Sequence, residues 1–532
     1  MSNIKILDCT LRDGGYINSW QFGKDNIRSI ISGLVKAGLE MIECGFLSEK
    51  AAFSEDDSRF NSPLEVDDLL PAGTGDSIFV AMINYGEMSA DSMPDCSGRL
   101  TGVRVAFHKK DRYDALELCA KLKDKGYKVF VQPMVAFSYT DEEYLELIRI
   151  VNAMKPYAFY IVDSHGSMKK EDVSKYYYLV ETNLSADIAL GFHSHNNLQL
   201  SYSNSQLLIS KQSVHTLILD SSVFGMGRGA GNLNTELLTD YLNNTTGTKY
   251  AIKQLLKVVD NSIEPIYHNY TWGFSMPYYL SAVYRCHQNY AGYLRDKQTL
   301  TVEDMDAIFS QIATDKKDSF DKAYVESLYR SYQDCKVADH TAREMLGEVI
   351  RGRNIVVLAP GKSVKRNKDL IIEAAEKNNA LIISVNHVNP DIRSDYVFMS
   401  NTRRYEMIKE KMVSGLIVTS NIREDTQAEF VLNYSDLLNN TEAVEDNVTL
   451  MLMELIISLG ARSASLAGVD GYVGGEKNFF NEQYETHEKS DIFTKKNAGL
   501  VKMLRYYSQQ IPLTFLTESV LDIDSTNGEI SK

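Results

Sequence analysis

Short apolar runs alternate with amphipathic segments along the first 245 residues of the chain. The apolar runs are continuous, which is typical of parallel strands that are buried on both faces. Between them, segments such as 26–38 and 141–154 carry apolar residues at helical spacing. The strands that this pattern predicts cover residues 4–8, 40–46, 77–83, 102–108, 128–134, 158–164, 187–193 and 215–221.

Eight strand–helix units in about 250 residues match the size of a TIM (β/α)8 barrel. An open, doubly wound sheet is the alternative. The succession of eight units without a glycine-rich dinucleotide turn favours a closed barrel. The fold class that we expect is therefore α/β, with a TIM barrel over residues 1–248.

The pattern changes twice after the barrel. Residues 249–348 are mostly helical in spacing and rich in tyrosine, which predicts a helical appendage. A second α/β pattern then fills residues 349–532, with a strand that runs into a loop expected over 354–363 and further strands at 380–386 and 464–472. We therefore expect a second, Rossmann-like domain that begins near residue 350.

Composition narrows the class of protein. A chain of 532 residues is too long for one ordinary core, and its net charge of −15 argues against a general nucleic-acid binder. No run approaches the roughly 20 apolar residues that span a bilayer, and the N-terminus lacks the layout of a secretory signal. The six cysteines form no CxxC pair, which favours reduced thiols. We expect a cytoplasmic protein without a membrane span.

Polar residues collect where the expected barrel strands end, and catalytic residues of TIM barrels lie at these ends. Arg12 and Asp13 follow the first strand, and His193 and His195 end the seventh. Residues i and i+2 of an extended segment point to the same side, so the two histidines can converge on one ion near Asp13. Two histidines and a carboxylate suit Mn²⁺, Fe²⁺, Co²⁺, Zn²⁺ or Mg²⁺. An isolated HxH is more often ordinary polar sequence, but its place at this rim favours a metal site.

Five motifs resemble one family in order along the chain. DCTLRDGG, IECGF, IVDSHGSM, GFHSHNN and GMGRGAGN together resemble the DRE-TIM metallolyases, which include 4-hydroxy-2-oxovalerate aldolases and hydroxymethylglutaryl-CoA lyases. The motifs occupy residues 8–15, 42–46, 161–168, 191–197 and 225–232. The resemblance implies a metal-dependent enzyme that makes or breaks a carbon–carbon bond.

The resemblance also implies roles for single residues. Asp13, His193 and His195 would bind the metal, with Asn232 as a fourth ligand. Mn²⁺ is the expected ion, with Mg²⁺, Co²⁺ or Zn²⁺ as alternatives. Arg12 would stabilise the oxygen of an enolate, because its charge lies where an oxyanion develops. The glycines after Asp13 would leave room for the substrate.

The other catalytic assignments leave alternatives open. Glu43 would orient Arg12 or a water, or would be a buried acid that holds the loop of Arg12. In the aldolases a histidine base stands three residues after the metal-binding aspartate, whereas this chain has Tyr16 there. Tyrosine, with an ordinary pKa near 10, is a poor base but could hydrogen-bond the substrate. His165 could replace the base if it faces the site, or could be a structural loop histidine.

Two other reactions of the family are alternatives. A hydroxymethylglutaryl-CoA lyase needs a cysteine in the loop after the eighth strand, and residues 225–232 contain none. A Claisen-type acyltransferase needs a coenzyme A site and further C-terminal machinery that the sequence does not reveal. The better expectation is aldol chemistry on a pyruvate-type unit, with a small-molecule oxo acid and an aldehyde as reactants.

The second domain gives a more diffuse resemblance. No cysteine follows Cys335, which argues against a fused acylating dehydrogenase, because such an enzyme needs a thiol. The order APGKS (359–363), SVN (384–386), SLGARSASLAGVDGY (458–472) and THEKSDI (486–492) resembles bacterial sialyltransferases and nonulosonate transferases, which bind CMP-sugars. Pro360 replaces the asparagine that is usual in the first turn. A degenerate transferase domain, or a scaffold that only binds partners, is the alternative.

That resemblance implies that Ser363 and Asn386 contact a nucleotide, that Tyr472 contacts a phosphate, and that His487 is the base. Alone, His487 would be an exposed loop histidine. The two resemblances together predict an aldolase fused to a nucleotide-sugar-binding domain, in bacterial glycan metabolism. The alternative is that glycosyl transfer by the second domain is the main activity. We also expect a homo-oligomer.

Overall fold

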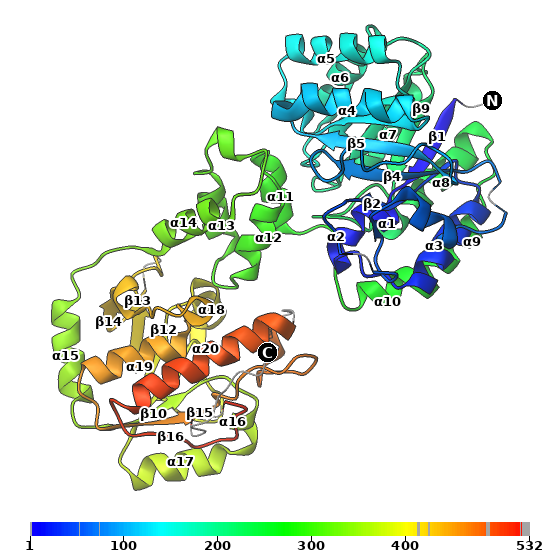
Figure 1. Cartoon of the computed structure of the whole chain (residues 1–532). Helices are drawn as coiled ribbons and strands as arrows, with labels where there is room; N and C mark the ends of the chain where they lie inside the picture. The colour runs from blue at the N-terminus through cyan, green and yellow to red at the C-terminus, as the bar shows by residue number, and fades with distance from the viewer. Residues whose placement is uncertain are drawn as a thin grey trace. The chain divides into compact units, whose positions relative to one another are not determined.

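The computed structural model describes residues 3–52, 54–73, 75–411, 415–423, 426–485, 490–521 and 523, with only the backbone of 490 and 491. It contains two compact units (Figure 1). One comprises residues 1–292 and 312–321, and the other comprises 293–311 and 322–532. The helical segment expected at 249–348 is thus shared between the two units.

The first unit is a closed parallel barrel. β1 pairs with β9 on one side and with β2 on the other, so that the order β1-β9-β8-β7-β6-β5-β4-β2 returns to β1. A two-residue strand, β3 (Arg59–Phe60), extends the sheet beside β2. The barrel strands are β1 (Ile4–Asp8), β2 (Met41–Leu47), β4 (Ile78–Asn84), β5 (Leu100–Phe107), β6 (Lys128–Pro133), β7 (Ala158–Asp163), β8 (Ala189–Ser194) and β9 (Leu217–Ser221). The predicted barrel is confirmed.

Helices follow six of the eight barrel strands. α5 begins with a capping box in which Thr140 and Glu143 exchange side-chain and backbone hydrogen bonds. β2 is followed by a 3-10 helix, and residues 85–99 after β4 form turns that contain Gly86 and Pro94, which disfavour a helix. The helices of this unit are α1 (Thr10–Asp13), α2 (Gly15–Asn18), α3 (Lys24–Ala37), α4 (Arg112–Asp124), α5 (Asp141–Met154), α6 (Lys170–Glu181), α7 (Ser201–Ser210), α8 (Thr235–Thr246), α9 (Ile252–Val258), α10 (Glu264–Tyr267) and α11 (Met276–Val283).

The second unit is built on one parallel sheet in the order β14-β13-β12-β11-β10-β15-β16. Its strands are β10 (Asn354–Leu358), β11 (Leu381–Val385), β12 (Tyr396–Met399), β13 (Leu416–Thr419), β14 (Phe430–Leu432), β15 (Ser463–Ala467) and β16 (Leu513–Phe515). The chain runs outward from β10 to β14 and then returns to place β15 on the other side of β10. Ligands of open α/β sheets bind where the strand order reverses in this way.

Helices cover the second sheet, and α19 and α20 pack against each other (Figure 1). They are α13 (Val302–Phe309), α14 (Lys322–Gln333), α15 (His340–Ile350), α16 (Ser363–Arg366), α17 (Lys368–Lys377), α18 (Thr402–Ile408), α19 (Val448–Ser458) and α20 (Ser490–Ser508), while α12 (Asn289–Asp296) contains the boundary between the units. The expected second α/β domain is therefore confirmed. None of the described helices is both long and apolar enough to span a membrane.

Candidate metal centre

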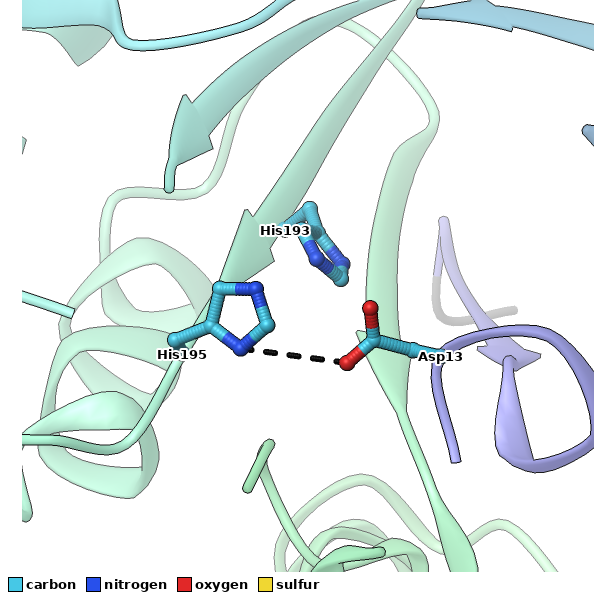
Figure 2. Close-up of side chains that lie close together, drawn as sticks. All are labelled: Asp13, His193 and His195. Carbon is cyan, nitrogen blue, oxygen red and sulfur yellow. Dashed lines mark ion pairs between the residues drawn. The ribbon is translucent and has the colours of Figure 1, made fainter. Parts of the chain in front are cut away.

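Three side chains that are far apart in sequence meet at the carboxyl end of the barrel (Figure 2). Asp13 ends the short α1, which directly follows β1, while His193 lies in β8 and His195 follows that strand. One potential ligand atom from each lies within 4.8 Å of the others, and all three side chains are buried. The sequence-predicted triad is thus brought together.

The orientation of the triad fits a divalent cation. Nδ1 of His193 lies 2.9 Å from Oδ2 of Asp220, which leaves Nε2 as the free nitrogen. Nδ1 of His195 lies 3.8 Å from Oδ2 of Asp13. Asn232 donates a hydrogen bond of 2.8 Å to the same Asp13 oxygen, and its own Oδ1 is buried without a partner in the described chain. The site thus gathers oxygen and imidazole donors whose bonding capacity is not filled by protein.

The charges at the site keep its ligands in the forms that bind metal. Burial alone would raise the pKa of Asp13, but Arg12 and the two histidines hold that pKa well below its usual range. Burial lowers the pKa of His195 to about 3. The carboxylate is therefore ionised and the imidazole neutral near pH 7, as metal ligation requires.

Arg12 is fixed at two of its three nitrogens. Nε donates to Glu43 Oε2 at 2.8 Å, and Nη1 donates to Asp13 Oδ1 at 2.6 Å. Nη2 is buried and has no hydrogen-bond partner in the part of the chain that the structure describes. A buried guanidinium N–H next to a metal ligand is therefore left for another acceptor.

The glycines of the first motif differ from the expectation that they leave room for substrate. A Cβ on Gly15 would clash with the indole of Trp20, and one on Gly14 would meet Thr10 and Met226. These glycines therefore permit close packing within the protein. Gly227 is the glycine next to the ligands, since a Cβ there would crowd Asp13 and Asn232.

A buried ionic network below the site was missed in the sequence. Glu43 accepts from Arg12 and also lies 2.7 Å from Arg104 Nη1, while Arg104 Nη2 pairs with Asp220. Asp220 in turn holds His193. The network therefore links Arg12 to His193 across the barrel interior. The available signal was a charged residue inside each of two apolar strand runs, GVRVAFH and LILDS.

Tyr16 contributes an aromatic surface beside the site. Its ring contacts Trp20 and Phe46 edge-on, with centroid distances of 4.7 and 6.0 Å. The guanidinium of Arg228 lies over the Tyr16 ring, 4.7 Å from its centroid. Arg228 belongs to the predicted motif GMGRGAGN, but its role was not predicted.

Further polar residues gather around Arg228. His165 is buried, and its Nε2 lies 3.9 Å from Oδ1 of Asp318, which the segment 312–321 contributes to this unit. Gln288, in the orientation that satisfies its amide, accepts from Arg228 Nε at 2.6 Å and donates to the carbonyl of Ser164. Burial lowers the pKa of His165 and of His287. His287, Gln288 and Asp318 could not be found from the sequence, because no motif contains them.

The predicted residues of the second unit are less closely associated. Ser363 donates from both its N–H and its hydroxyl to the carboxylate of Asp470. Asn386 accepts from the N–H of Ser400, and the Tyr472 ring stacks on Phe493 at a centroid distance of 5.4 Å. A side-chain carboxylate therefore occupies the groups of Ser363 that were expected to meet a nucleotide. His487 lies outside the described residues.

Comparison with known proteins agrees with the geometry of the barrel. Residues 87–261 match the HMGL-like family. The 4-hydroxy-2-oxovalerate aldolase of Moorella thermoacetica is 28% identical over 285 residues, which is 50% of this chain and 78% of that protein. The corresponding enzyme of Geobacillus genomosp. 3 is 26% identical over 278 residues, 49% of this chain and 77% of that one. An oxaloacetate decarboxylase of Mycobacterium tuberculosis is 24% identical and covers 44% of this chain and 68% of its own.

A solved structure supports the fold alone. The carboxyl transferase domain of Rhizobium etli pyruvate carboxylase aligns with a TM-score of 0.50 and 14% identity, over 66% of each chain. Residues 87–261 are thus similar to the HMGL-like family, and the chain has 4-hydroxy-2-oxovalerate aldolases among its relatives. These findings support a carbon–carbon lyase, which confirms that part of the sequence prediction.

Proposed function

We propose that the barrel is a divalent-metal-dependent aldolase that cleaves or forms a 4-hydroxy-2-oxo acid, with pyruvate as one product or reactant. The observation that carries the proposal is the free Nη2 of Arg12 beside the buried cluster of Asp13, His193 and His195. Aldolases among the relatives support the same substrate class. Mn²⁺ is the ion that we propose, with Asn232 as a further oxygen donor.

In the cleavage direction the bond between C3 and C4 breaks, and its electron pair goes to C3 as the pyruvate enolate forms. The metal, when bound, supplies a Lewis acid for the 2-oxo acid. Arg12 donates from Nη2 to the oxygen on which negative charge develops. Glu43 and Asp13 hold this guanidinium in place from its other nitrogens. C4 leaves as the aldehyde once the 4-hydroxyl loses its proton.

His165 is the base that we propose for this proton. Its lowered pKa leaves the imidazole neutral near pH 7. Nδ1 has no hydrogen-bond partner among the described residues, and Nε2 faces Asp318. With Nε2–H directed to the carboxylate, Nδ1 has the lone pair that accepts the proton, and Asp318 stabilises the resulting imidazolium. Tyr16 is covered by Arg228 on one face and serves as a positioning residue.

The test is pyruvate release from a panel of 4-hydroxy-2-oxo acids by the full chain with added Mn²⁺, measured with lactate dehydrogenase. We expect turnover that EDTA abolishes and Mn²⁺ restores. Oxaloacetate is tested as a second substrate in the same assay, since its decarboxylation also leaves a pyruvate enolate. Turnover of oxaloacetate alone would replace the aldolase proposal by a decarboxylase, and no pyruvate from any compound would refute both. H165Q should lower kcat and remove the acidic limb of the pH profile.

We further propose that the second unit binds a nucleotide sugar of the CMP type. The supporting observation is Arg404 of α18, which is half-buried and has a buried Nη1 without a hydrogen-bond partner in the described chain. Burial lowers its pKa to about 10, which indicates a poorly compensated positive charge. The stacked Tyr472 and Phe493 offer an aromatic surface in the same unit.

Calorimetric titration with CMP and CMP-sialic acid tests this second proposal. We expect binding that R404Q weakens at least tenfold, while R403Q, which changes the neighbouring exposed arginine, leaves it unchanged. Absence of binding to the unaltered chain would refute it. Light scattering on the same protein tests the expected homo-oligomer.

A further inference from the structure

The mouth of the barrel contains a guanidinium whose positive charge the protein does not neutralise. Arg228 is half-buried and stacks on Tyr16, and its Nε is held by the neutral amide of Gln288. Within the described ranges of the chain, it forms no ion pair with a carboxylate. By contrast, Arg12 beside the cluster and Arg104 in the network below it each pair with two carboxylates.

Arg228 lies close to the cluster of Asp13, His193 and His195. Its neighbour Gly227 approaches Asp13 and Asn232 so closely that a Cβ would crowd both. The guanidinium is therefore near enough to the cluster for a small molecule to reach both.

Neutral imidazoles add hydrogen-bonding capacity at the same place. His287 accepts at Nδ1 from the N–H of Asn289 at 3.2 Å, so its proton is on Nε2. His165 is buried with both ring nitrogens free of hydrogen bonds in the described chain. Asp318 is the acidic group that faces this area from segment 312–321, and it is directed to His165. The Nε2–H of His287 is thus a further donor in this area, and no carboxylate of the described residues pairs with Arg228.

The aromatic partner explains how the guanidinium keeps its place without a carboxylate. Arginine stacks on aromatic faces while its N–H groups stay available in the plane. Tyr16 is itself held by edge contacts with Trp20 and Phe46. Its ring therefore fixes one face of Arg228 and leaves the outer edge of the fork for an acceptor.

We propose that Arg228, held on the Tyr16 ring, binds an anionic group on the half of the substrate that leaves as the aldehyde. The inference rests on the proposed function and defines its substrate class: a 2-oxo acid that carries a second acidic group, either a carboxylate or a phosphate. Retro-aldol cleavage of such a compound yields pyruvate and an acidic aldehyde such as glyoxylate. The planar fork of arginine matches either anion with two hydrogen bonds.

A pair of unreactive probes tests the proposal without catalysis. 2-Oxoglutarate and 2-oxopentanoate have the same length and the same 2-oxo acid head, and they differ in a terminal carboxylate against a methyl group. Titration into the full chain loaded with Mn²⁺ should show 2-oxoglutarate binding about 10- to 100-fold more tightly, as expected for a charge-assisted hydrogen bond. R228Q should bring the two affinities within about twofold and should not weaken Mn²⁺ binding.

Substitutions of Tyr16 separate the contribution of its ring from that of its hydroxyl. Y16F should retain the preference for 2-oxoglutarate, because the ring remains, whereas Y16L should reduce it. Equal affinities of the unaltered protein for the two probes, or no binding of either, would overturn the proposal. A preference that survives in R228Q would overturn it as well.

Activity assays with different aldehydes then distinguish a failure of this inference from a failure of the proposed function. In the aldol direction, pyruvate consumption is compared for glyoxylate, glyceraldehyde 3-phosphate and acetaldehyde. A preference for either acidic aldehyde supports the inference and identifies carboxylate or phosphate as the anion. Turnover with equal efficiency on acetaldehyde refutes the inference but keeps the aldolase. No turnover, together with an Arg228-dependent preference for 2-oxoglutarate, refutes the aldolase but keeps the anion site.

Discussion

The two units treat buried charge in opposite ways. In the barrel, Glu43, Arg104 and Asp220 form a chain of ion pairs whose members are almost completely buried. In the second unit, His387 is buried with Nε2 unpartnered in the described chain, and the buried Nη1 of Arg404 likewise lacks an acceptor. In the first arrangement each charge has a counter-charge within ion-pair distance, whereas in the second these two side chains form no ion pair among the described residues.

This difference separates two ways of building a site. A buried charge that has a fixed counter-charge can hold catalytic groups in place before substrate arrives. A buried polar group without a partner has a desolvation cost that only another molecule or a change of protonation removes. The barrel should therefore depend on its ion pairs, and the second unit should depend on pH.

The largest effect is expected from the metal cluster at the end of the barrel network. H195A removes one of three ligands that the protein holds ready, so Mn²⁺ binding measured by calorimetry should be lost. Pyruvate release should fall by about a thousandfold or more, because the metal supplies several kcal/mol of charge stabilisation. H268A, on the exposed His268 that follows α10, is the matched control. Full Mn²⁺ affinity in H195A would contradict the assignment of His195 as a metal ligand.

Arg104 tests whether the network stabilises the barrel as a unit. R104M leaves the carboxylates of Glu43 and Asp220 buried without their shared counter-charge, and removal of one partner of a buried pair costs about 3–5 kcal/mol. Urea denaturation should show that loss in the free energy of unfolding. K121M, in an exposed pair with Glu117, should change it by less than about 0.5 kcal/mol. Similar losses of unfolding free energy in R104M and K121M would show that the buried network does not stabilise the barrel more than an exposed ion pair does.

His387 tests the opposite behaviour. Burial lowers its pKa to about 4, below the 6.5 of an unfolded histidine. Between these values the unfolded chain binds the proton first, so stability is retained above pH 6.5 and lost as the pH falls toward 4. The loss is on the order of 3 kcal/mol. H387N should flatten this part of the stability curve, with H340N on an exposed histidine as control. An unchanged slope in H387N would contradict the assignment.

The smallest effect concerns the loop that follows β10. S363A removes the hydroxyl that donates to Asp470 and leaves the backbone N–H of residue 363 bonded to the same carboxylate. We expect the free energy of unfolding to fall by about 1–2 kcal/mol. S327A, at an exposed serine whose hydroxyl bonds within its own helix, should have no effect beyond a few tenths. A neutral S363A would show that Asp470 does not hold this loop through the side chain.

The sequence predicted the elements better than their long-range partners. The barrel strands were found within about two residues, and α5 was predicted at its observed bounds, because apolar runs and helical spacing are local signals. The triad of Asp13, His193 and His195 was predictable because parallel strands end at one rim. The pair of Arg104 and Asp220 was not, since 116 residues separate its members and only closure of the barrel joins them.

The role of Tyr16 shows a second limit of prediction from the sequence. A tyrosine where a histidine was expected signalled a change in chemistry, but its partner Arg228 is more than 200 residues away. Asp318 was equally unpredictable, because it belongs to segment 312–321, which is separated in sequence from residues 1–292 of the same unit. Sequence motifs therefore predicted which side chains meet at the barrel rim, and the fold was needed to identify what surrounds them.

The path of the chain between the two units has a practical consequence. The polypeptide leaves the barrel unit after residue 292, returns for residues 312–321 and leaves again, so three covalent junctions join the units. A fragment truncated at residue 292 would lack Asp318, and a fragment extended to 321 would carry an orphaned piece of the second unit. The enzyme therefore has no single scissile linker, and limited proteolysis should release neither half intact. Gene fusions, deletions and crystallisation fragments of this protein should be designed around the whole chain.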